Sequence, residues 1–500
     1  MSIFRAIFVA VAVLWPITCI GGAAARPNVL WICADDHAAY VMGAYGNRQL
    51  HTPNLDRLAA EGMRFDRAYC NSPVCTASRQ SFLTGRYPRT IGVTQLSTPL
   101  PESEITLAEL LKDAGYATAS IGKMHFNSAL KHGFDLRIDD AEFAAALKQK
   151  GRTPFDAKIP VLPQWRPFRD PARVWLNGFH RPYGAIDADM QGTFFAQQAT
   201  EYLSARRDVP FFLMVSFYEP HSPFRYPIEY RDRHDPAGFA VPQPGPEDDN
   251  QVPAIFRELT DADKQGIAAS YYTSVEFMDK NVGLVLEALE RSGHGDDTVV
   301  VYTGDHGYLL GQHGRFEKHS SYEEAVRSPL LLKVPRVTRP GSSTRALVEL
   351  IDVVPTILEA CGRQIPPTVQ GRSLGPLLKG ETDRHRDQVF VEYAPNDELM
   401  VRDEQWKLVF ERGKRRRTDG YDHGETLPGH TVRLFDLDKD PSELHNLARD
   451  PDQAARIERY VNSLVDHLKR TSRRAEFVPQ SDDSFEILDA CVQPRDVGAK

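Results

Sequence analysis

Four apolar, strand-like runs separated by helix-like segments constrain the fold of this chain most strongly. The runs cover residues 28–34, 116–121, 210–217 and 298–303. A continuous apolar run of this length is typical of a strand that is buried on both faces of a parallel sheet. Strands that alternate with helices in this way predict an α/β fold with a large, mostly parallel sheet flanked by helices.

Each predicted strand is followed directly by charged or histidine side chains. In open parallel sheets, ligands bind beyond the carboxyl ends of the strands. Carboxylates that face one another at such an edge repel unless a positive charge lies between them. The sequence therefore predicts a charged functional site there. The residues at the four strand ends are Asp35 and Asp36, Lys123 and His125, Glu219 and His221, and Asp305 and His306.

The pattern changes after about residue 370. Short strand-like segments at 389–393, 399–402, 406–410 and 434–437 predict a small antiparallel sheet, followed by a helix over 452–469. Residues 151–186, rich in Pro, Arg and Trp, indicate an insertion loop, and the basic run 414–417 indicates an exposed hairpin loop. We therefore predict a catalytic domain over 26–370, a C-terminal subdomain over 371–475 and a polar tail over 476–500.

The N-terminus has the features of a secretory signal peptide. Arg5 precedes an apolar stretch that is too short to span a bilayer, and three alanines end at Ala25. We expect cleavage near Ala25 and a secreted or periplasmic protein. Cys19 allows an alternative with a lipid anchor, but the segment 16–18 (PIT) is a poor lead-in for lipidation.

Composition excludes several classes of protein. Hydrophobic residues make up 41% and charged residues 26% of the 500 residues, which is ordinary for a soluble globular protein. The formal net charge of −8 gives no reason to expect nucleic acid or an anionic membrane as partner. The few cysteines after residue 25 do not form a disulfide framework for a chain of this size.

The segment 72–86 (SPVCTASRQSFLTGR) contains the most informative cysteine. Ser72 and Pro73 favour a turn, and residues 76–83 can form a helix, so Cys75 lies near a helix N-terminus, where an anionic atom is stabilised. Arg79, one turn along, directs a positive charge towards it. Taken alone, these features leave two interpretations open: a reactive cysteine and a buried structural cysteine.

The residues Cys75, Ala77 and Arg79 match the pattern C-x-[PA]-x-R, which resembles the maturation signature of the sulfatase family. In that family, a dedicated enzyme oxidises the cysteine to formylglycine, and the hydrated aldehyde is the catalytic nucleophile. The resemblance implies an alkaline-phosphatase-like fold. It also implies that Cys75 is not a thiol in the working protein.

Further segments resemble sulfatase motifs in the family's order, so the resemblance runs from about residue 27 to about residue 470. Many family members have Asn where this chain has His306. The matching segments are 122–125 (GKMH), 220–223 (PHSP), 303–307 (TGDHG), 311–319 (GQHGRFEKH) with its lysine at 318, and 434–443 (LFDLDKDPSE).

The resemblance implies a divalent cation beside the nucleophile. Carboxylate oxygens suit Ca²⁺ or Mg²⁺, and Ca²⁺ tolerates an irregular cluster better, so we expect Ca²⁺, with Mg²⁺ as the alternative. A solvated turn is the usual interpretation of adjacent aspartates, but here an apolar strand leads straight into them. The predicted ligands are Asp35, Asp36, Asp305, His306 and one oxygen of the modified Cys75.

The resemblance also assigns roles to the catalytic residues. One oxygen of the hydrate at Cys75, with its pKa lowered by the cation and Arg79, attacks sulfur. Lys123 and Lys318 neutralise the sulfuryl oxygens in the transition state.

Histidines carry the proton transfers in this scheme. His221, assisted by Lys318, protonates the departing alcohol. His125 then takes a proton from the second hydroxyl, so that sulfate leaves. His313 and His319 receive no role, and structural or substrate-contact roles are expected of them.

The sequence therefore predicts a secreted sulfatase that acts on a sulfated carbohydrate or an aryl or alkyl sulfate. Its other partner would be the enzyme that generates formylglycine, and no transmembrane segment is expected. Two alternatives stay open: a phosphate or phosphonate monoester hydrolase on the same scaffold, and a catalytically silent glycan-binding protein. The loop over 151–186 could stack on a sugar or simply pack against the core.

Overall fold

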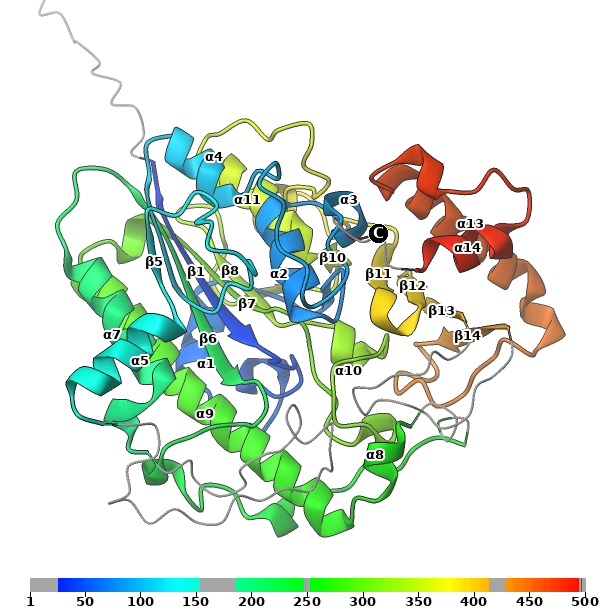
Figure 1. Cartoon of the computed structure of the whole chain (residues 1–500), viewed down its shortest axis with the longest axis horizontal. Coiled ribbons are helices and arrows are strands. Elements are labelled where there is room, and N and C mark those ends of the chain that lie inside the picture. The colour runs from blue at the N-terminus through cyan, green and yellow to red at the C-terminus, as the bar shows by residue number, and fades with distance from the viewer. Residues whose placement is uncertain are drawn as a thin grey trace, which may run out of the picture.

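An eight-stranded sheet runs through the larger part of the molecule, with helices on both of its faces (Figure 1). The computed structural model describes residues 26–152, 185–246, 248, 252–412, 429–493 and 496. The predicted signal peptide, most of the predicted insertion loop and the basic run 414–417 lie outside these residues. The strand order is β5-β4-β6-β1-β7-β8-β2-β9. Its strands are β1 (Asn28–Asp35), β2 (Met63–Phe65), β4 (Ala117–Gly122), β5 (Leu136–Ile138), β6 (Phe211–Pro220), β7 (Thr298–Gly304), β8 (Leu330–Lys333) and β9 (Ser342–Thr344).

Most neighbouring strands of this sheet are parallel, which confirms the predicted fold class. The exception is β8, which runs antiparallel to both β7 and β2. Its direction is set by the connection that precedes it and not by its apolar residues, so the sequence pattern did not reveal it. The central strand β1 lies between β6 and β7.

Both faces of β1 are buried, which explains its continuous apolar sequence. Leu30 and Ile32 pack with helices α1 (Pro53–Glu61), α7 (Gln191–Ser204) and α9 (Asp261–Arg291). Val29 and Trp31 face the opposite layer, which contains α2 (Cys75–Thr84), α4 (Leu107–Asp113) and α11 (Val353–Ala360). Alternate side chains of a strand point to opposite faces, so a central strand covered on both sides has no polar face.

Helix ends follow local side-chain chemistry. Helix α4 begins at Leu107, because Thr106 forms a capping box with Glu109. Thr260 caps α9 in the same way. Thr52 precedes α1, but its hydroxyl makes no cap bond and instead accepts from the Gly43 N–H.

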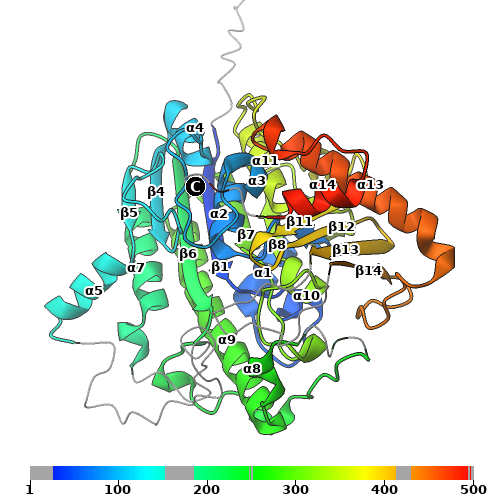
Figure 2. The same cartoon turned by 45° about the vertical axis from the view of Figure 1, so that its right-hand side comes forward.

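A separate four-stranded antiparallel sheet follows, as the sequence predicted (Figure 2). It contains β11 (Val389–Tyr393), β12 (Glu398–Arg402), β13 (Trp406–Arg412) and β14 (His430–Asp436). Helix α13 (Ala454–Thr471) packs on it together with α14 (Ser484–Cys491), which the sequence did not predict. The remaining short elements are β3 (Ala68–Tyr69), α3 (Pro88–Ile91), α5 (Asp140–Gln149), α8 (Ala254–Arg257), α10 (Glu323–Val326), β10 (Val348–Glu349) and α12 (Gly375–Leu378).

The described cysteines are all free and buried, so no disulfide framework links the described residues, in agreement with the sequence analysis. They are Cys33, Cys70, Cys75, Cys361 and Cys491. Among the described helices, none combines the length and the apolar character that a membrane crossing needs.

Gly122 allows β4 and β6 to approach closely at the edge of the sheet where Lys123 lies. It ends β4 with a φ of +99°, a conformation that residues with a Cβ rarely adopt. A Cβ at this position would lie 1.9 Å from the Ser216 carbonyl oxygen. The same oxygen accepts a hydrogen bond of 3.0 Å from the Lys123 N–H, so the close approach of the two strands positions Lys123.

We predict that Gly122→Ala lowers the free energy of unfolding by about 3 kcal/mol, because the Cβ forces β4 and β6 apart. Gly293→Ala is the matched control: its φ is +79°, but a Cβ there has nothing within 4 Å. The control should lose about 1 kcal/mol through backbone strain alone. Denaturant unfolding of both variants measures the difference, and equal losses would contradict the close approach.

Candidate active site

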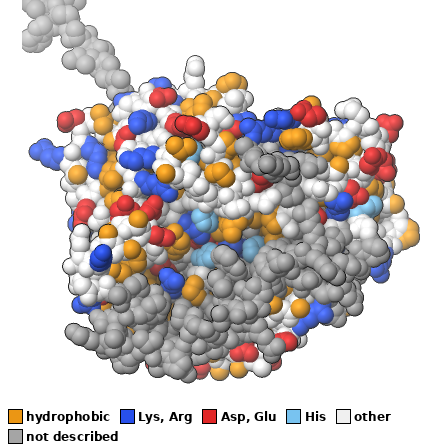
Figure 3. Space-filling model, viewed as in Figure 1, with side chains coloured by type: hydrophobic (Ala, Val, Ile, Leu, Met, Phe, Trp, Pro, Cys, Tyr) orange, Lys and Arg blue, Asp and Glu red, His pale blue; other side chains and the backbone are white. Residues whose placement is uncertain are grey.

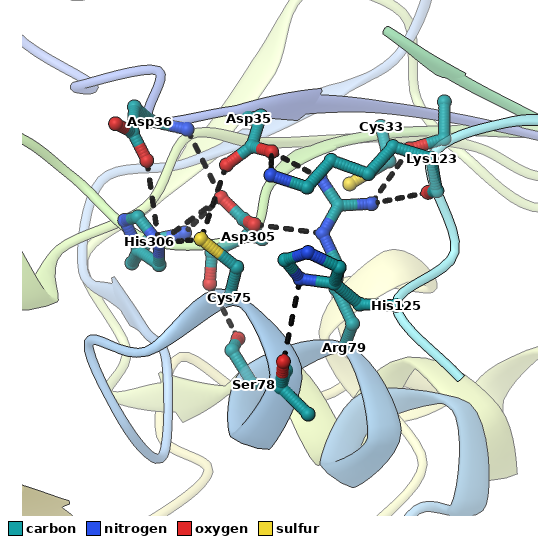
Figure 4. Close-up of polar contacts among 12 residues, drawn as sticks. Cys33, Asp35, Asp36, Cys75, Ser78, Arg79, Lys123, His125, Asp305 and His306 are labelled. Atoms are coloured by element: carbon teal, nitrogen blue, oxygen red, sulfur yellow. Dashed lines mark hydrogen bonds and ion pairs between the residues drawn. The ribbon is translucent and has the colours of Figure 1, made fainter. Parts of the chain in front are cut away.

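The carboxyl ends of β1, β4, β6 and β7 place charged side chains around one point (Figure 4). Asp35 ends β1, Lys123 follows β4, and Asp305 follows β7. His221 comes directly after β6. The four strand ends that the sequence predicted to converge therefore do so.

Cys75 is the first residue of α2 and lies at the centre of this group. Its sulfur is 3.3 Å from Asp35 Oδ1, 3.3 Å from His306 Nε2 and 2.9 Å from Lys318 Nζ. The residue is only 1% exposed. The helix N-terminus and a lysine thus meet at the residue that the sequence predicts to be converted into the nucleophile.

The predicted cation ligands are brought together and buried. The ligand atoms of Asp35, Asp36, Cys75 and His306 all lie within 4.8 Å of one another. Asp305 lies beside them, with Oδ1 3.5 Å from His306 Nε2. The same Oδ1 accepts from the N–H groups of Asp36 and His306, and so holds the two strand ends together.

Arg79 lies within electrostatic reach of Cys75, but its hydrogen bonds go to other groups. Its guanidinium makes no hydrogen bond to Cys75: Nε donates to Asp305 Oδ2 at 2.8 Å, and Nη2 lies 3.6 Å from Asp35 Oδ2. Nη1 donates to the Lys123 carbonyl oxygen. Arg79 therefore holds two predicted ligands and a catalytic lysine in position, through contacts with three separate strand ends.

Two lysines bring positive charge to the carboxylates. Lys123 Nζ forms an ion pair with Asp35 Oδ2, and Lys318 Nζ lies 2.6 Å from Asp36 Oδ1. Burial by itself raises the pKa of Asp35, but Lys123, His221 and Arg79 outweigh it and hold this pKa well below its ordinary value. Burial also raises the pKa of Asp36, to about 6, against the opposing charge of Lys318.

The Cys75 thiol and the imidazoles of His125 and His221 are neutral in this environment. Burial raises the pKa of the Cys75 thiol, so the unmodified thiol stays protonated. Burial and Lys123 lower the pKa of His125 to about 2. Burial, Lys318 and Lys123 lower the pKa of His221 to about 3. His125 Nδ1 lies 3.4 Å from the Thr76 hydroxyl, and His221 Nε2 lies 3.9 Å from Asp36 Oδ2.

A cavity of about 960 Å³ opens onto these groups. In the space-filling view, pale-blue histidine and blue basic side chains gather in a hollow near the middle of the face, bordered by hydrophobic side chains (Figure 3). Aromatic and apolar residues line its wall next to the charged centre. They include Leu96, Phe143, Met190, Tyr218, Tyr308 and Tyr393.

The sequence did not identify several of the residues around the site. His319 lines the cavity, with its ring stacked on Tyr393 and Nδ1 3.4 Å from Glu317 Oε2. His313 is buried elsewhere and pairs with Asp248 at 3.0 Å. No local sequence pattern indicates which of the two histidines lines the cavity. Their different positions arise from the 3₁₀ turn at residues 312–314, where His313 has a φ of +55°.

The chemistry of these side chains fits a divalent cation. The carboxylates of Asp35 and Asp36 and the His306 imidazole surround one place, with Asp305 beside them, and oxygen ligands of this kind suit a hard cation. The charges of Asp35, Asp36 and Asp305 are balanced by those of Lys123, Lys318 and Arg79. A divalent cation would give the centre the net positive charge that an anionic substrate requires.

Comparisons with known proteins agree with this geometry. The family model described as "Sulfatase" matches residues 27–363, and the one described as "N-sulphoglucosamine sulphohydrolase, C-terminal" matches 311–471. The chain is 28% identical to the arylsulfatase of Clostridium perfringens over 89% of this chain and 95% of that one. It is 27% identical to an N-acetylglucosamine-6-O-sulfatase of Bacteroides thetaiotaomicron, over 84% and 82% of the two chains. The structure of a phosphonate monoester hydrolase from Silicibacter pomeroyi superposes with a TM-score of 0.75 at 25% identity, over 91% of this chain and 98% of that chain.

We predict that the purified protein binds one divalent cation per chain. Asp36→Asn removes a ligand charge and should weaken cation affinity about tenfold or more. Asp297→Asn is the control, because Asp297 is exposed and pairs with Arg336 far from the site. Elemental analysis and calorimetric titration measure stoichiometry and affinity, and unchanged values for Asp36→Asn would remove Asp36 from the cation site.

Proposed function

The chain belongs to the sulfatase family, and from this membership we propose that it hydrolyses sulfate esters through a formylglycine made from Cys75 and a bound Ca²⁺. The proposal includes export of the protein after cleavage near Ala25, which N-terminal sequencing of the exported protein tests. The observation that carries the proposed hydrolysis is the position of Cys75 at a helix N-terminus, between Asp35, His306 and Lys318.

The surroundings of Cys75 support an oxygen nucleophile better than a thiolate. Burial raises the pKa of the thiol, and a protonated thiol is a weak nucleophile. The same surroundings offer carboxylates and an imidazole for a hard cation, which favours oxygen over sulfur as its partner. Formylglycine would supply a hydrated aldehyde, with one oxygen for attack on sulfur and a second that allows sulfate to leave. The bound cation would supply positive charge beside that attack.

Positive side chains bind the sulfate group in this proposal. Lys123 and Lys318 both line the cavity beside Cys75, where they can neutralise the sulfuryl oxygens as charge develops. Arg79 acts through other residues: it positions Asp305, Asp35 and the backbone of Lys123. We therefore propose Arg79 as a positioning residue, in addition to the positive charge that it directs towards position 75.

Neutral histidines suit the proposed proton transfers. His125 has a pKa lowered to about 2, so its imidazole is neutral in the free site, and negative charge on the sulfated group at position 75 would raise this pKa and allow the imidazole to accept a proton. His221 is also neutral in the free site, with a pKa of about 3. A bound anionic ester adds negative charge beside His221 and raises this pKa, while Lys318, whose pKa lies well above its ordinary value, is already protonated. We propose His221, assisted by Lys318, as the proton donor to the leaving alcohol.

A sulfated carbohydrate, or an aryl or alkyl sulfate, is the proposed substrate. Relatives of this chain are named for aryl sulfates and for a sulfated amino sugar. The cavity has room for a monosaccharide-sized group, and the half-buried Phe143 and Tyr218 in its wall offer aromatic surface for a ring. The maturation enzyme that oxidises Cys75 is the proposed protein partner, and mass spectrometry of the Cys75 peptide would reveal the aldehyde. A wholly unmodified thiol in an active preparation would contradict this part of the proposal.

We predict that Cys75→Ser, produced where only cysteine is oxidised, completes at most one turnover. A serine hydroxyl could attack sulfur, but it has no second hydroxyl from which His125 can take a proton. The protein should therefore accumulate a stable sulfate ester on the introduced serine, visible by mass spectrometry. Cys361→Ser, a buried cysteine away from the site, is the control and should turn over repeatedly. Steady turnover by Cys75→Ser with an unconverted serine would exclude the two-oxygen mechanism.

A phosphonate or phosphate monoester hydrolase is the second candidate, because a phosphonate monoester hydrolase shares this fold at a TM-score of 0.75. We predict that kcat/KM is higher for an aryl sulfate than for the matching aryl phosphate or phosphonate monoester. Using one leaving group in all three esters isolates the preference for sulfur or phosphorus. A clear preference for a phosphorus ester would replace the proposed function with this alternative.

A further inference from the structure

One wall of the active-site cavity is a loop without regular secondary structure. Residues 94–98 (TQLST) follow α3, and Gln95, Leu96 and Ser97 line the cavity. The Leu96 side chain is 45% exposed, which is unusual for a large apolar residue of this protein. It therefore offers an apolar surface to the organic part of a bound ester. The position of this loop affects the fit of the substrate beyond its sulfate group.

The loop is held from behind by Asp496, close to the end of the chain. Asp496 is only 8% exposed. Its Oδ1 accepts from the Thr94 N–H at 2.9 Å, and its Oδ2 accepts from the Gln95 N–H at 3.0 Å. The hydroxyls of Thr94 and Thr98 donate to the same carboxylate. Four donors on a buried carboxylate form a strong, charge-assisted anchor.

The opposite side of the loop contacts the catalytic helix. The Leu96 carbonyl oxygen accepts from the Thr76 hydroxyl at 2.6 Å and from Asn127 Nδ2 at 2.8 Å. Thr76 follows the proposed nucleophile, and its hydroxyl is the group 3.4 Å from His125 Nδ1. The loop is therefore fixed between Asp496 on one side and residues that adjoin Cys75 and His125 on the other.

Asp496 lies outside the segments that the two family models match. The matched segments cover 27–363 and 311–471. The anchor therefore joins a C-terminal residue of this chain to a pocket wall that lies about 400 residues earlier, within the catalytic region.

We propose that Asp496 is a positioning residue that sets the shape of the substrate pocket by anchoring loop 94–98. The inference rests on the proposed function, because it concerns the fit of the ester that the site would hydrolyse. Asp496 does not touch the sulfate-binding groups. Loss of its charge should therefore alter recognition of the organic group and leave the binding of the sulfate group unchanged.

The test compares Asp496→Asn with Asp482→Asn, a matched change at an exposed aspartate of the same C-terminal segment. We expect Asp496→Asn to raise KM for a bulky aryl or sugar sulfate about tenfold, since small displacements in a site are costly. The inhibition constant of inorganic sulfate should stay at the wild-type value. Equal weakening of sulfate and ester binding would indicate a general structural defect and overturn the proposal.

A double-mutant cycle tests the contact itself. Thr98→Val removes one donor to Asp496 and should raise KM less than Asp496→Asn does. When the two changes are combined, their effects should be less than additive, because both act on the same contact. Additive effects would show that Asp496 does not act through this loop.

Hydrogen exchange tests the contact between Asp496 and loop 94–98 without an assay of enzyme activity. The amides of Thr94 and Gln95 donate to Asp496, so exchange of a peptide covering 94–98 should be faster in Asp496→Asn than in the wild type or Asp482→Asn. Unchanged exchange would overturn the anchor even in an active enzyme. Faster exchange in a protein that hydrolyses no sulfate ester would support the anchor while refuting the proposed function.

Discussion

The buried contact between Arg79 and Asp305 is the interaction on which the rest of the site depends. Both side chains are fully buried, and their atoms approach to 2.8 Å. Removing one partner of such a pair costs about 3–5 kcal/mol, because a charge is left unpaired in a low-dielectric interior. Asp305 in turn holds the N–H groups of Asp36 and His306, and Arg79 holds the Lys123 carbonyl. One ion pair therefore fixes the relative positions of three strand ends.

A parallel sheet suits this arrangement because all its charged strand ends lie at one edge. The apolar strands that carry them are buried on both faces by two layers of helices, so they cannot shift without opening the core. Helix α2 adds Cys75 from the side, with its N-terminus directed at the carboxylates and Lys318. The site combines groups that repel or attract strongly, and the rigidity of the sheet keeps them at fixed distances.

The residues of the charged centre could be predicted from the sequence because each follows an apolar strand. Asp35, Asp305 and His221 all lie where that pattern placed them. The antiparallel direction of β8 could not be predicted, since a run of apolar residues does not indicate the direction in which a strand pairs with its neighbours. The interaction of the Thr52 hydroxyl with the Gly43 N–H, in place of a helix cap, could not be predicted either, because Gly43 comes from a different turn.

The sequence by itself determined which residues are candidates for the chemistry: Cys75, the strand-end carboxylates, the lysines and the histidines are of the types that the proposed cation and anionic ester would require. Only the tertiary structure decided how they are oriented. Arg79 is one helical turn from Cys75, yet it bonds to Asp305, because β7 brings that carboxylate within reach. Asp496 and loop 94–98 meet only after the C-terminal segment has packed. Contacts between such distant residues depend on the packing of whole elements, and no local pattern in the chain records them.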